Sequence, residues 1–191
     1  MKAIILAAGR GSRMRDLTIN QPKCFIELHG KRLIDWQLSS LRGAGIKEIA
    51  IVTGYKRQMF SEDLRYFVNS NWQNSNILAS LLTARDWLEK YSCIISYSDI
   101  VYSRDAVKRL KILKDPIGMA YDKNWFSLWS KRFTNPLSDA ESFKINSQGL
   151  LTDIGRKPKN LKEIEGQFMG LFKIEPIGWQ EILSIINEFS F

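Results

Sequence analysis

The N-terminal stretch up to Lys23 constrains the fold of this chain more than any other part of the sequence. Residues 3–7 form a short, fully apolar run, AIILA, which is typical of a central parallel strand. Gly9 and Gly11 follow, and they permit a tight backbone whose amide groups stay open to a ligand. A strand, a glycine loop and spaced cations together favour the binding of a triphosphate. The cations are Arg13, Arg15 and Lys23.

Two common phosphate-binding motifs do not describe this loop. No Gly-Lys-Ser/Thr closes it, so it is not a Walker loop, and Met14 stands where the dinucleotide fingerprint needs its third glycine. A lone Gly-x-Gly also occurs where a buried strand ends in a flexible basic turn. The phosphate-binding interpretation is favoured by the residues that accompany it, which are Ser12-Arg13, Leu17-Thr18 and Pro22-Lys23.

Length and charge indicate one globular domain with an anionic ligand. The chain has 191 residues, which suits a single domain over 1–191. Its 28 Lys and Arg against 20 Asp and Glu give a net charge of +8, which favours polyanionic ligands. Nucleic acid is one such ligand. A nucleotide or a phosphorylated substrate explains the charge equally well, because many of the cations lie near glycines.

The cysteines and the single histidine argue against several kinds of site. Cys24 and Cys93 lie far apart, without a second thiol or a histidine at metal-ligand spacing, so a disulfide framework and a zinc site are disfavoured. A reducing cytoplasm is the expected location. His29 precedes Gly30 in an expected hairpin turn, which argues against catalysis by histidine. No stretch reaches the roughly 20 apolar residues that span a bilayer.

The remaining pattern alternates helices and strands and predicts an α/β fold. Residues 35–44 have the spacing of an amphipathic helix, and 46–52 form an apolar strand that leads to Gly54 and Tyr55. Ligands in such sheets bind beyond the carboxyl ends of the strands. We therefore expect a Rossmann-like mixed, mostly parallel sheet flanked by helices. Further helices are expected at 56–67, 77–90, 106–113 and 179–191, and further strands at 93–102, 117–121, 142–146 and 167–174.

An acid ends the apolar part of the segment at 93–102. Asp99 would lie in the same crevice at the strand ends as Gly9 and Gly54. Mg²⁺ takes hard oxygen ligands and shares them with substrate phosphates, so we expect Asp99 to bind magnesium. The alternative is a structural role, in which Asp99 caps the helix that follows.

An aromatic segment at 122–133 carries two interpretations. It interleaves tryptophans and phenylalanines with cations. Such a stripe fits a hydrophobic core. It also fits a cage in which Trp125 contacts an ammonium group by a cation–π interaction, while Lys131 or Arg132 binds a phosphate.

The N-terminal motif resembles the signature of the sugar-nucleotidyltransferase superfamily. That signature reads Leu-Ala-Ala-Gly-x-Gly-(Ser/Thr)-Arg, then Leu-Thr, then Pro-Lys, and residues 6–13, 17–18 and 22–23 match it. From residue 1 to about 174 the chain is similar to the CTP-dependent cytidylyltransferase branch, whose members activate phosphocholine, 2-aminoethylphosphonate or phosphoglutamine. The resemblance implies the nucleotide-diphospho-sugar transferase type of fold.

The resemblance also implies roles for individual residues. Arg13 and Lys23 would neutralise charge on the phosphates with help from Lys157, and Asp99 would hold Mg²⁺. The asparagine-rich stretch at 69–76 is typical of a turn, but the family's Asn-x-x-x-Ser motif would place two of its side chains near the base. The implied nucleotide-binding residues are Leu6, Ala7, Ala8, Gly9, Gly11, Ser12, Gly54, Tyr55, Asn76 and Ser80. The implied acceptor-binding residues are Trp125, Lys131, Arg132, Asp139 and Glu141.

The implied activity is transfer of CMP from CTP to a small phosphate or phosphonate monoester, with release of pyrophosphate. Such a reaction would serve head-group activation or capsule and surface modification. The acceptor oxygen is already ionised at neutral pH, so no general base is needed. The expected cofactor is Mg²⁺, and the expected partners are CTP and the acceptor, with neither nucleic acid nor a membrane, and with oligomerisation left open.

One departure from the family concerns the second metal carboxylate, which such enzymes usually carry beyond the last expected strand. Only Glu175 and Glu188 are candidates here, so we expect that a C-terminal portion is missing. The alternative functions are a sugar-1-phosphate nucleotidyltransferase, a non-catalytic nucleotide-binding regulatory domain, and a basic nucleic-acid binder whose affinity would fall steeply with salt.

Overall fold

The computed structural model describes residues 1–61 and 63–189. They divide into two compact units. The first comprises Met1–Gly118 and Gly170–Phe191, and the second comprises Met119–Met169. The expectation of a single domain stays a prediction. Among the described residues, no helix combines the length and the apolar character that a membrane span requires.

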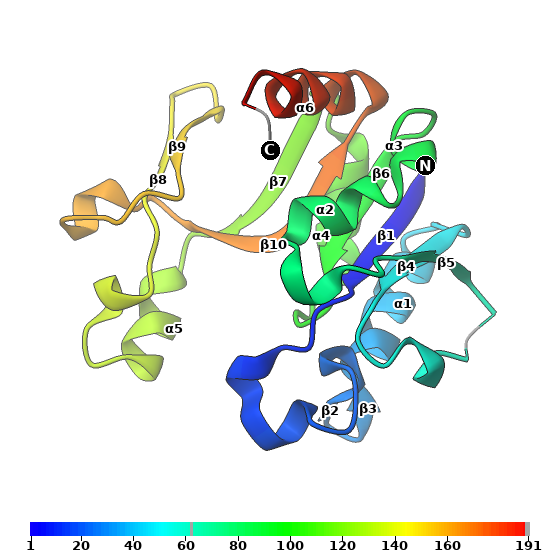
Figure 1. Cartoon of the computed structure of the whole chain (residues 1–191). Helices are drawn as coiled ribbons and strands as arrows, with labels where there is room; N and C mark the ends of the chain where they lie inside the picture. Colours follow the sequence, from blue (N-terminus) through cyan, green and yellow to red (C-terminus); the bar gives the residue numbers. More distant parts are fainter. Residues whose placement is uncertain (62, 190–191) are drawn as a thin grey trace. The chain divides into compact units, whose positions relative to one another are not determined.

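The main sheet has six strands in the order β5-β4-β1-β6-β10-β7 (Figure 1), of which β5, β4, β1 and β6 lie wholly in the first unit. Strand β1 pairs in parallel with β4 on one side and β6 on the other, and β4 pairs in parallel with β5. Strand β10 runs antiparallel to β6. The expected mixed, mostly parallel sheet is therefore confirmed. The strands are β1 Lys2–Ala7, β4 Ile49–Thr53, β5 Arg65–Val68, β6 Cys93–Tyr97, β7 Ile117–Asp122 and β10 Gln167–Ile174.

Helices cover both faces of this sheet, which explains the apolar run at the N-terminus. All six residues of β1 are buried, as expected for a strand with neighbours on both sides and helices above and below. Ile4 and Leu6 pack in one core with α2, α3 and α6. Successive side chains of a strand alternate between faces, and the other face is covered by α1 and α4, which pack together (Figure 1). The helices are α1 Leu33–Gly43, α2 Ile77–Leu82, α3 Arg85–Leu88, α4 Arg104–Ile112 and α6 Pro176–Phe189.

The segment between β1 and α1 forms short turns and a hairpin. Two 3₁₀ segments, η1 Ser12–Thr18 and η2 Lys23–Phe25, precede the strands β2 Glu27–Leu28 and β3 Lys31–Arg32. His29 and Gly30 connect these strands with φ values of 53° and 72°. Positive φ at both turn residues is the geometry of a tight hairpin turn, so the predicted turn is confirmed.

The prediction of a helix at 56–67 is wrong. The 3₁₀ turn η3 Arg57–Met59 is followed by strand β5, whose Phe67 packs in the core. The apolar spacing suggested a helix, but pairing of β5 with the edge of β4 satisfies the backbone and buries the same ring. The single helix expected at 77–90 is divided into α2 and α3, with Ala84 buried against the sheet between them.

The second unit is small and has its own core. The hairpin of β8 Phe143–Ile145 and β9 Leu151–Ile154 lies in it, with helix α5 Trp125–Arg132 and the 3₁₀ turns η5 Pro136–Ser138 and η6 Leu161–Glu163. Trp125, Ala140 and Ile164 form the buried cluster, against which Trp129 and Leu137 pack.

An ion pair at the end of β10, between Lys173 and Glu175, also makes hydrogen bonds to other parts of the first unit. Lys173 is fully buried, and its ammonium group contacts Glu175 Oε1 at 2.8 Å and donates to the Leu113 carbonyl. Burial alone would raise the pKa of Glu175. Hydrogen bonds from Lys173 and Ser92, together with the Lys173 charge, instead hold that pKa below its usual 4.5. At pH values above 4.5 the ionised carboxylate therefore stabilises the fold. This stabilisation is lost as the pH falls through the lowered folded-state pKa.

Glu175→Gln should lower the free energy of unfolding at pH 7 by about 2 kcal/mol, because it leaves the Lys173 charge buried without its partner. Urea denaturation measures this. The difference from wild type should shrink as the pH falls below 4.5 and through the lowered folded-state pKa of Glu175, because the wild-type carboxyl then also becomes neutral. Glu89→Gln, in the more exposed Arg85–Glu89 pair, is the control and should change stability by less than about 0.5 kcal/mol. Equal effects in both variants would contradict this role for the buried pair.

Candidate active site

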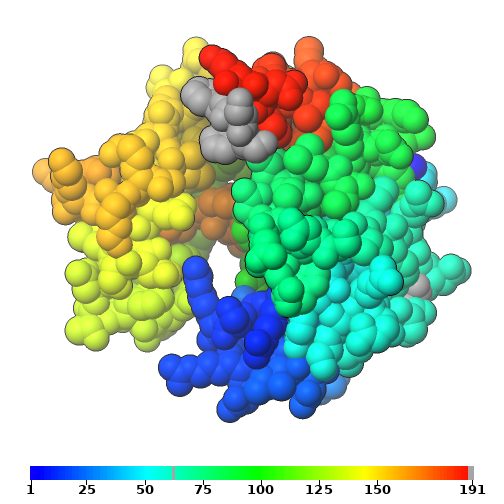
Figure 2. All heavy atoms as spheres, viewed as in Figure 1, coloured from blue at the N-terminus to red at the C-terminus, as the bar shows by residue number. Residues whose placement is uncertain are grey.

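A cleft of about 260 Å³ lies within the first unit, at the carboxyl ends of β1 and β6 and beside the start of α2. The blue N-terminal segment lies against the green segment that contains α2 on the molecular surface (Figure 2). Segments far apart in the sequence therefore build one site. Its lining residues are Leu6, Ala8, Gly9, Gly11, Lys23, Trp72, Ser75, Asn76, Ile77, Ser80, Tyr97, Ser98 and Asp99.

Gly11 leaves room for the side chain of Lys23 to reach the cleft. Gly11 has a φ of 69°, and a Cβ atom there would lie 2.8 Å from Cδ of Lys23. Its carbonyl accepts a hydrogen bond of 3.2 Å from the Thr18 hydroxyl, which is buried. Glycine is needed here both for the left-handed backbone and for the close approach of a lysine side chain.

Lys23 and Asp99 meet at one end of the cleft although 76 positions separate them in the sequence. Lys23 Nζ lies 2.5 Å from Asp99 Oδ2, and the two side chains keep 25% and 34% of their exposure. The pair is therefore reachable by a ligand. Ser103, not Asp99, caps α4, since its hydroxyl accepts from the Ala106 amide. The capping alternative for Asp99 is thus excluded.

Helix α1 holds the loop that carries Asp99. The fully buried amide of Gln37 donates from Nε2 to the carbonyls of Tyr97 at 2.8 Å and Ile100 at 2.6 Å. Ser40 donates to the carbonyl of Tyr102 at 2.7 Å. These bonds lie on both sides of Asp99 and fix the backbone from which its carboxylate extends.

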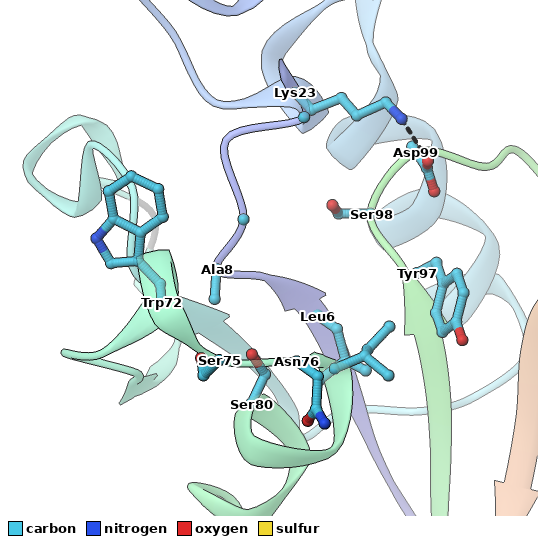
Figure 3. A pocket seen from close by; sticks show the side chains of 13 residues that line it. Leu6, Ala8, Lys23, Trp72, Ser75, Asn76, Ser80, Tyr97, Ser98 and Asp99 are labelled. Carbon is cyan, nitrogen blue, oxygen red and sulfur yellow. Dashed lines mark hydrogen bonds and ion pairs between the residues drawn. The ribbon is translucent and has the colours of Figure 1, made fainter. Parts of the chain in front are cut away.

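Polar side chains of the asparagine-rich segment lie at the other end of the cleft from Lys23 and Asp99 (Figure 3). Ser75 and Asn76 belong to this segment, and Ser80 of α2 lines the same end of the cleft. The Asn76 side chain caps α2, because its Oδ1 accepts from the Ala79 amide at 2.9 Å. The expected turn is present as the 3₁₀ turn Trp72–Asn74. Asn76 and Ser80 line the cleft, and their contact with a base stays a prediction.

Gly54 and Tyr55 support the cleft without lining it. A Cβ atom on Gly54 would lie 2.7 Å from both the Ala8 carbonyl oxygen and Trp72 Cβ, so glycine lets these groups approach. The Tyr55 amide donates to the Ala8 carbonyl at 2.8 Å, and its hydroxyl donates to the carbonyls of Thr18 at 3.0 Å and Ile19. Tyr55 thereby holds the glycine loop and the turn that follows it.

The structure brings most of the expected nucleotide-binding residues together, with some exceptions. Ala7 is buried in β1, and Ser12 and Arg13 are exposed on η1 outside the cleft lining. Sequence reasoning missed Trp72, Ser75, Ile77, Tyr97 and Ser98. The position of Tyr97 and Ser98 directly before Asp99 was a usable signal, whereas nothing local marked Trp72 as a lining residue.

The residues expected to bind the acceptor all belong to the second unit. Trp125 is 4% exposed and packs in that unit's core, which favours the core interpretation of this segment over the expected ammonium cage. The amine of Lys157 donates to the carbonyls of Leu137 at 2.8 Å and Ser138 at 2.6 Å. The remaining expected residues are exposed there, and their roles stay predictions: Lys131, Arg132, Asp139 and Glu141.

Asp99 is the acidic side chain of the cleft lining. Among the described residues, no group of three or more His, Cys, Asp or Glu could hold a metal ion by itself. Glu175 does not supply a second carboxylate here. Ile174 pairs with Cys93 at the amino end of β6, and Ser92 donates to Glu175, whereas Asp99 follows the carboxyl end of that strand.

Comparison with known proteins identifies the class. The model of the MobA-like NTP transferase domain matches residues 3–124, and the chain belongs to this family of nucleotidyltransferases. The predicted resemblance is therefore confirmed. Over 184 residues the chain is 43% identical to the CTP:phosphoglutamine cytidylyltransferase of Campylobacter jejuni subsp. jejuni, covering 91% of this chain and 72% of that protein.

Two further relatives agree with this assignment. The choline-phosphate cytidylyltransferase of Streptococcus pneumoniae is 37% identical over 93 residues, which is 46% of this chain and 41% of that protein. A solved structure of CTP:phosphocholine cytidylyltransferase from the same species superposes with a TM-score of 0.70 at 21% identity, covering 98% of this chain and 76% of that one. That likeness confirms the fold.

Gly11→Ala should lower the free energy of unfolding by about 1–3 kcal/mol, because it forces an L-residue into a left-handed backbone and against Lys23. Gly9→Ala is the matched control, since a Cβ atom there meets nothing within 4 Å in the free protein. It should leave stability unchanged or raise it slightly. Urea denaturation of both variants, without nucleotide, tests the difference. Equal stabilities would contradict the close approach.

Proposed function

We propose that this chain transfers CMP from CTP to a small phosphate or phosphonate monoester and releases pyrophosphate. The observation that carries the proposal is the Lys23–Asp99 pair, which lies beside a glycine loop at one end of a cleft. The relatives support it, since those named above are cytidylyltransferases for phosphoglutamine and choline phosphate. A 2-aminoethylphosphonate cytidylyltransferase of Lancefieldella rimae is also 33% identical over 110 residues.

The proposed reaction is an in-line displacement at the α-phosphorus of CTP. An ionised oxygen of the acceptor forms the new P–O bond, and the bond to the β-phosphate oxygen breaks, so that pyrophosphate leaves with the electron pair. The nucleophile needs no proton removed. The catalytic work is therefore to position the phosphates and to stabilise their charge. The Gly9–Gly11 loop supplies amide groups for this, and Lys23 supplies a cation. Arg13, exposed on η1, and Lys157 would add positive charge in the proposed reaction.

Mg²⁺ is part of this proposal, with Asp99 as the residue that would hold it. The carboxylate fits a cation because its oxygens are hard ligands, it lies in the cleft lining and it remains partly exposed, so Mg²⁺ could replace Lys23 as its partner. Magnesium is commonly bound through one or two carboxylates and substrate phosphates, which suits a site with this single acid. When bound, the ion would neutralise charge on the phosphates.

The acceptor and the setting of the reaction are also part of the proposal. Phosphoglutamine, phosphocholine and 2-aminoethylphosphonate, the groups named for the relatives, combine a phosphate or phosphonate with a small polar or cationic body. The proposed product is a CMP-activated head group for capsule or surface modification, made in the cytoplasm. The burial of Trp125 leaves the acceptor contacts to other residues.

Lys23→Ala and Asp99→Ala should each lower turnover on the order of 10²- to 10³-fold, because each removes charge stabilisation from the phosphates or their metal. Pyrophosphate release from CTP with each of the three acceptors, in the presence of Mg²⁺, measures this. Arg85→Ala and Glu89→Ala form the matched control, since that pair has a similar distance of 2.6 Å on the surface of α3. Near-normal release by either cleft variant would rule out the assigned roles.

A further inference from the structure

Asn69 is a buried residue outside the cleft that connects two of the hydroxyl groups lining it. It directly follows β5 and is 5% exposed. Its Nδ2 donates to the hydroxyl oxygens of Ser75 at 2.8 Å and Ser80 at 2.9 Å. Its Oδ1 accepts from the Asn71 amide at 3.1 Å. A backbone N–H can only donate, so this bond fixes which end of the Asn69 amide faces the serines.

This arrangement determines in which direction each serine hydroxyl accepts a hydrogen bond and in which direction it can donate one. An amide NH₂ has two protons, and both are used by the two hydroxyl oxygens. Each serine oxygen therefore accepts from Asn69, and its own proton must point elsewhere. Within the described part of the chain, neither proton has an acceptor among the side-chain hydrogen bonds of Ser75 and Ser80. Both residues line the cleft, so the protons are left for a ligand.

The two serines lie where the proposed function places the base, and this step rests on that function. The triphosphate belongs at Lys23 and the glycine loop, and Ser75 and Ser80 lie at the other end of the cleft (Figure 3). Leu6 and Trp72 supply apolar surface to the same cleft, which suits a pyrimidine ring. A base bound there meets hydroxyl donors.

The chemistry of the two pyrimidines differs at the ring atom that these donors would meet. Cytosine presents two adjacent acceptors, O2 and the unprotonated N3. Uracil presents O2 beside a protonated N3, which is a donor. A serine could accept the uracil N3–H with its remaining lone pair. Its own proton would then lack an acceptor, and for Ser80, which is 8% exposed, that loss is costly.

We propose that Asn69 is a positioning residue that selects cytosine over uracil. It does so by donating to Ser75 and Ser80, which makes both hydroxyls donors toward the cleft. Wild-type protein should therefore bind CTP about 10-fold or more tightly than UTP, the loss expected for one unmatched buried polar group. Titration calorimetry with CTP and UTP, without acceptor, measures this ratio.

The sharpest test is Asn69→Asp, which keeps the shape of the side chain and reverses its hydrogen bonding. An ionised carboxylate still accepts from the Asn71 amide but cannot donate to the serines. The serines would then donate to the carboxylate and turn lone pairs to the cleft. The ratio of the UTP to the CTP dissociation constant should fall about 10-fold or more. An unchanged ratio in a folded variant overturns the proposal.

Asn74→Asp is the matched control for the added charge. Asn74 is exposed in the same asparagine-rich segment and makes no side-chain hydrogen bond to either serine. This variant should weaken both nucleotides equally and leave their ratio as in wild type. A fall in the ratio equal to that of Asn69→Asp would assign the effect to charge alone and overturn the role of Asn69.

Two further measurements cover a variant that fails to fold and a failure of the proposed reaction. The double variant Ser75→Ala, Ser80→Ala removes both hydroxyls without burying a charge, and its ratio should approach one. A ratio that stays at the wild-type value overturns the proposal. If wild type binds CTP selectively but releases no pyrophosphate with any acceptor, the proposed function fails and the selection by Asn69 stands. If wild type turns over but binds UTP as tightly as CTP, the selection fails.

Discussion

The parallel pairing of β1 with both β4 and β6 is the constraint on which the rest of the first unit depends. Three parallel strands have their carboxyl ends at the same edge of the sheet, so the loops that follow them lie close together at that edge. β1 is buried on both faces and carries only apolar side chains after Lys2. Polar chemistry can therefore begin only where the strand stops, at Ala8 and Gly9. The same argument places Asp99 beyond β6.

Beyond that edge, side-chain bonds to backbone carbonyls hold the loops in place. Tyr55 binds the turn after the glycine loop, and Gln37 binds both sides of Asp99. Neither residue is among those that line the cleft. Loops held in this way present amides and charges in a fixed arrangement before the ligand arrives, which reduces the reorganisation that binding and reaction require. The precision of the site thus comes from residues behind it as much as from those that face the ligand.

Features set by local sequence were predictable, and features set by distant pairing were not. The N-terminal strand and loop, the His29 turn and the acid after β6 each follow from a few adjacent residues. The helix wrongly expected at 56–67 shows the limit, because its apolar spacing also suits β5 once β4 offers an edge. Trp125 shows a second limit of sequence-based prediction, because an aromatic side chain in a core and one in a ligand cage have the same sequence pattern. The contact between Asn69 and Ser80 spans 11 positions and depends on the loop conformation, which no periodicity reports.

If the cleft binds the base as proposed, its lining residues alone do not determine which base it prefers. A serine hydroxyl can donate or accept, so the same two serines could suit either pyrimidine. In this structure Asn69 removes that freedom, and the Asn71 amide in turn determines the orientation of Asn69. Each step is a bond between a group that can only donate and one that must then accept. Base preference can therefore differ between two members of such a family whose clefts are lined by identical side chains, if they differ at the buried position behind the serines.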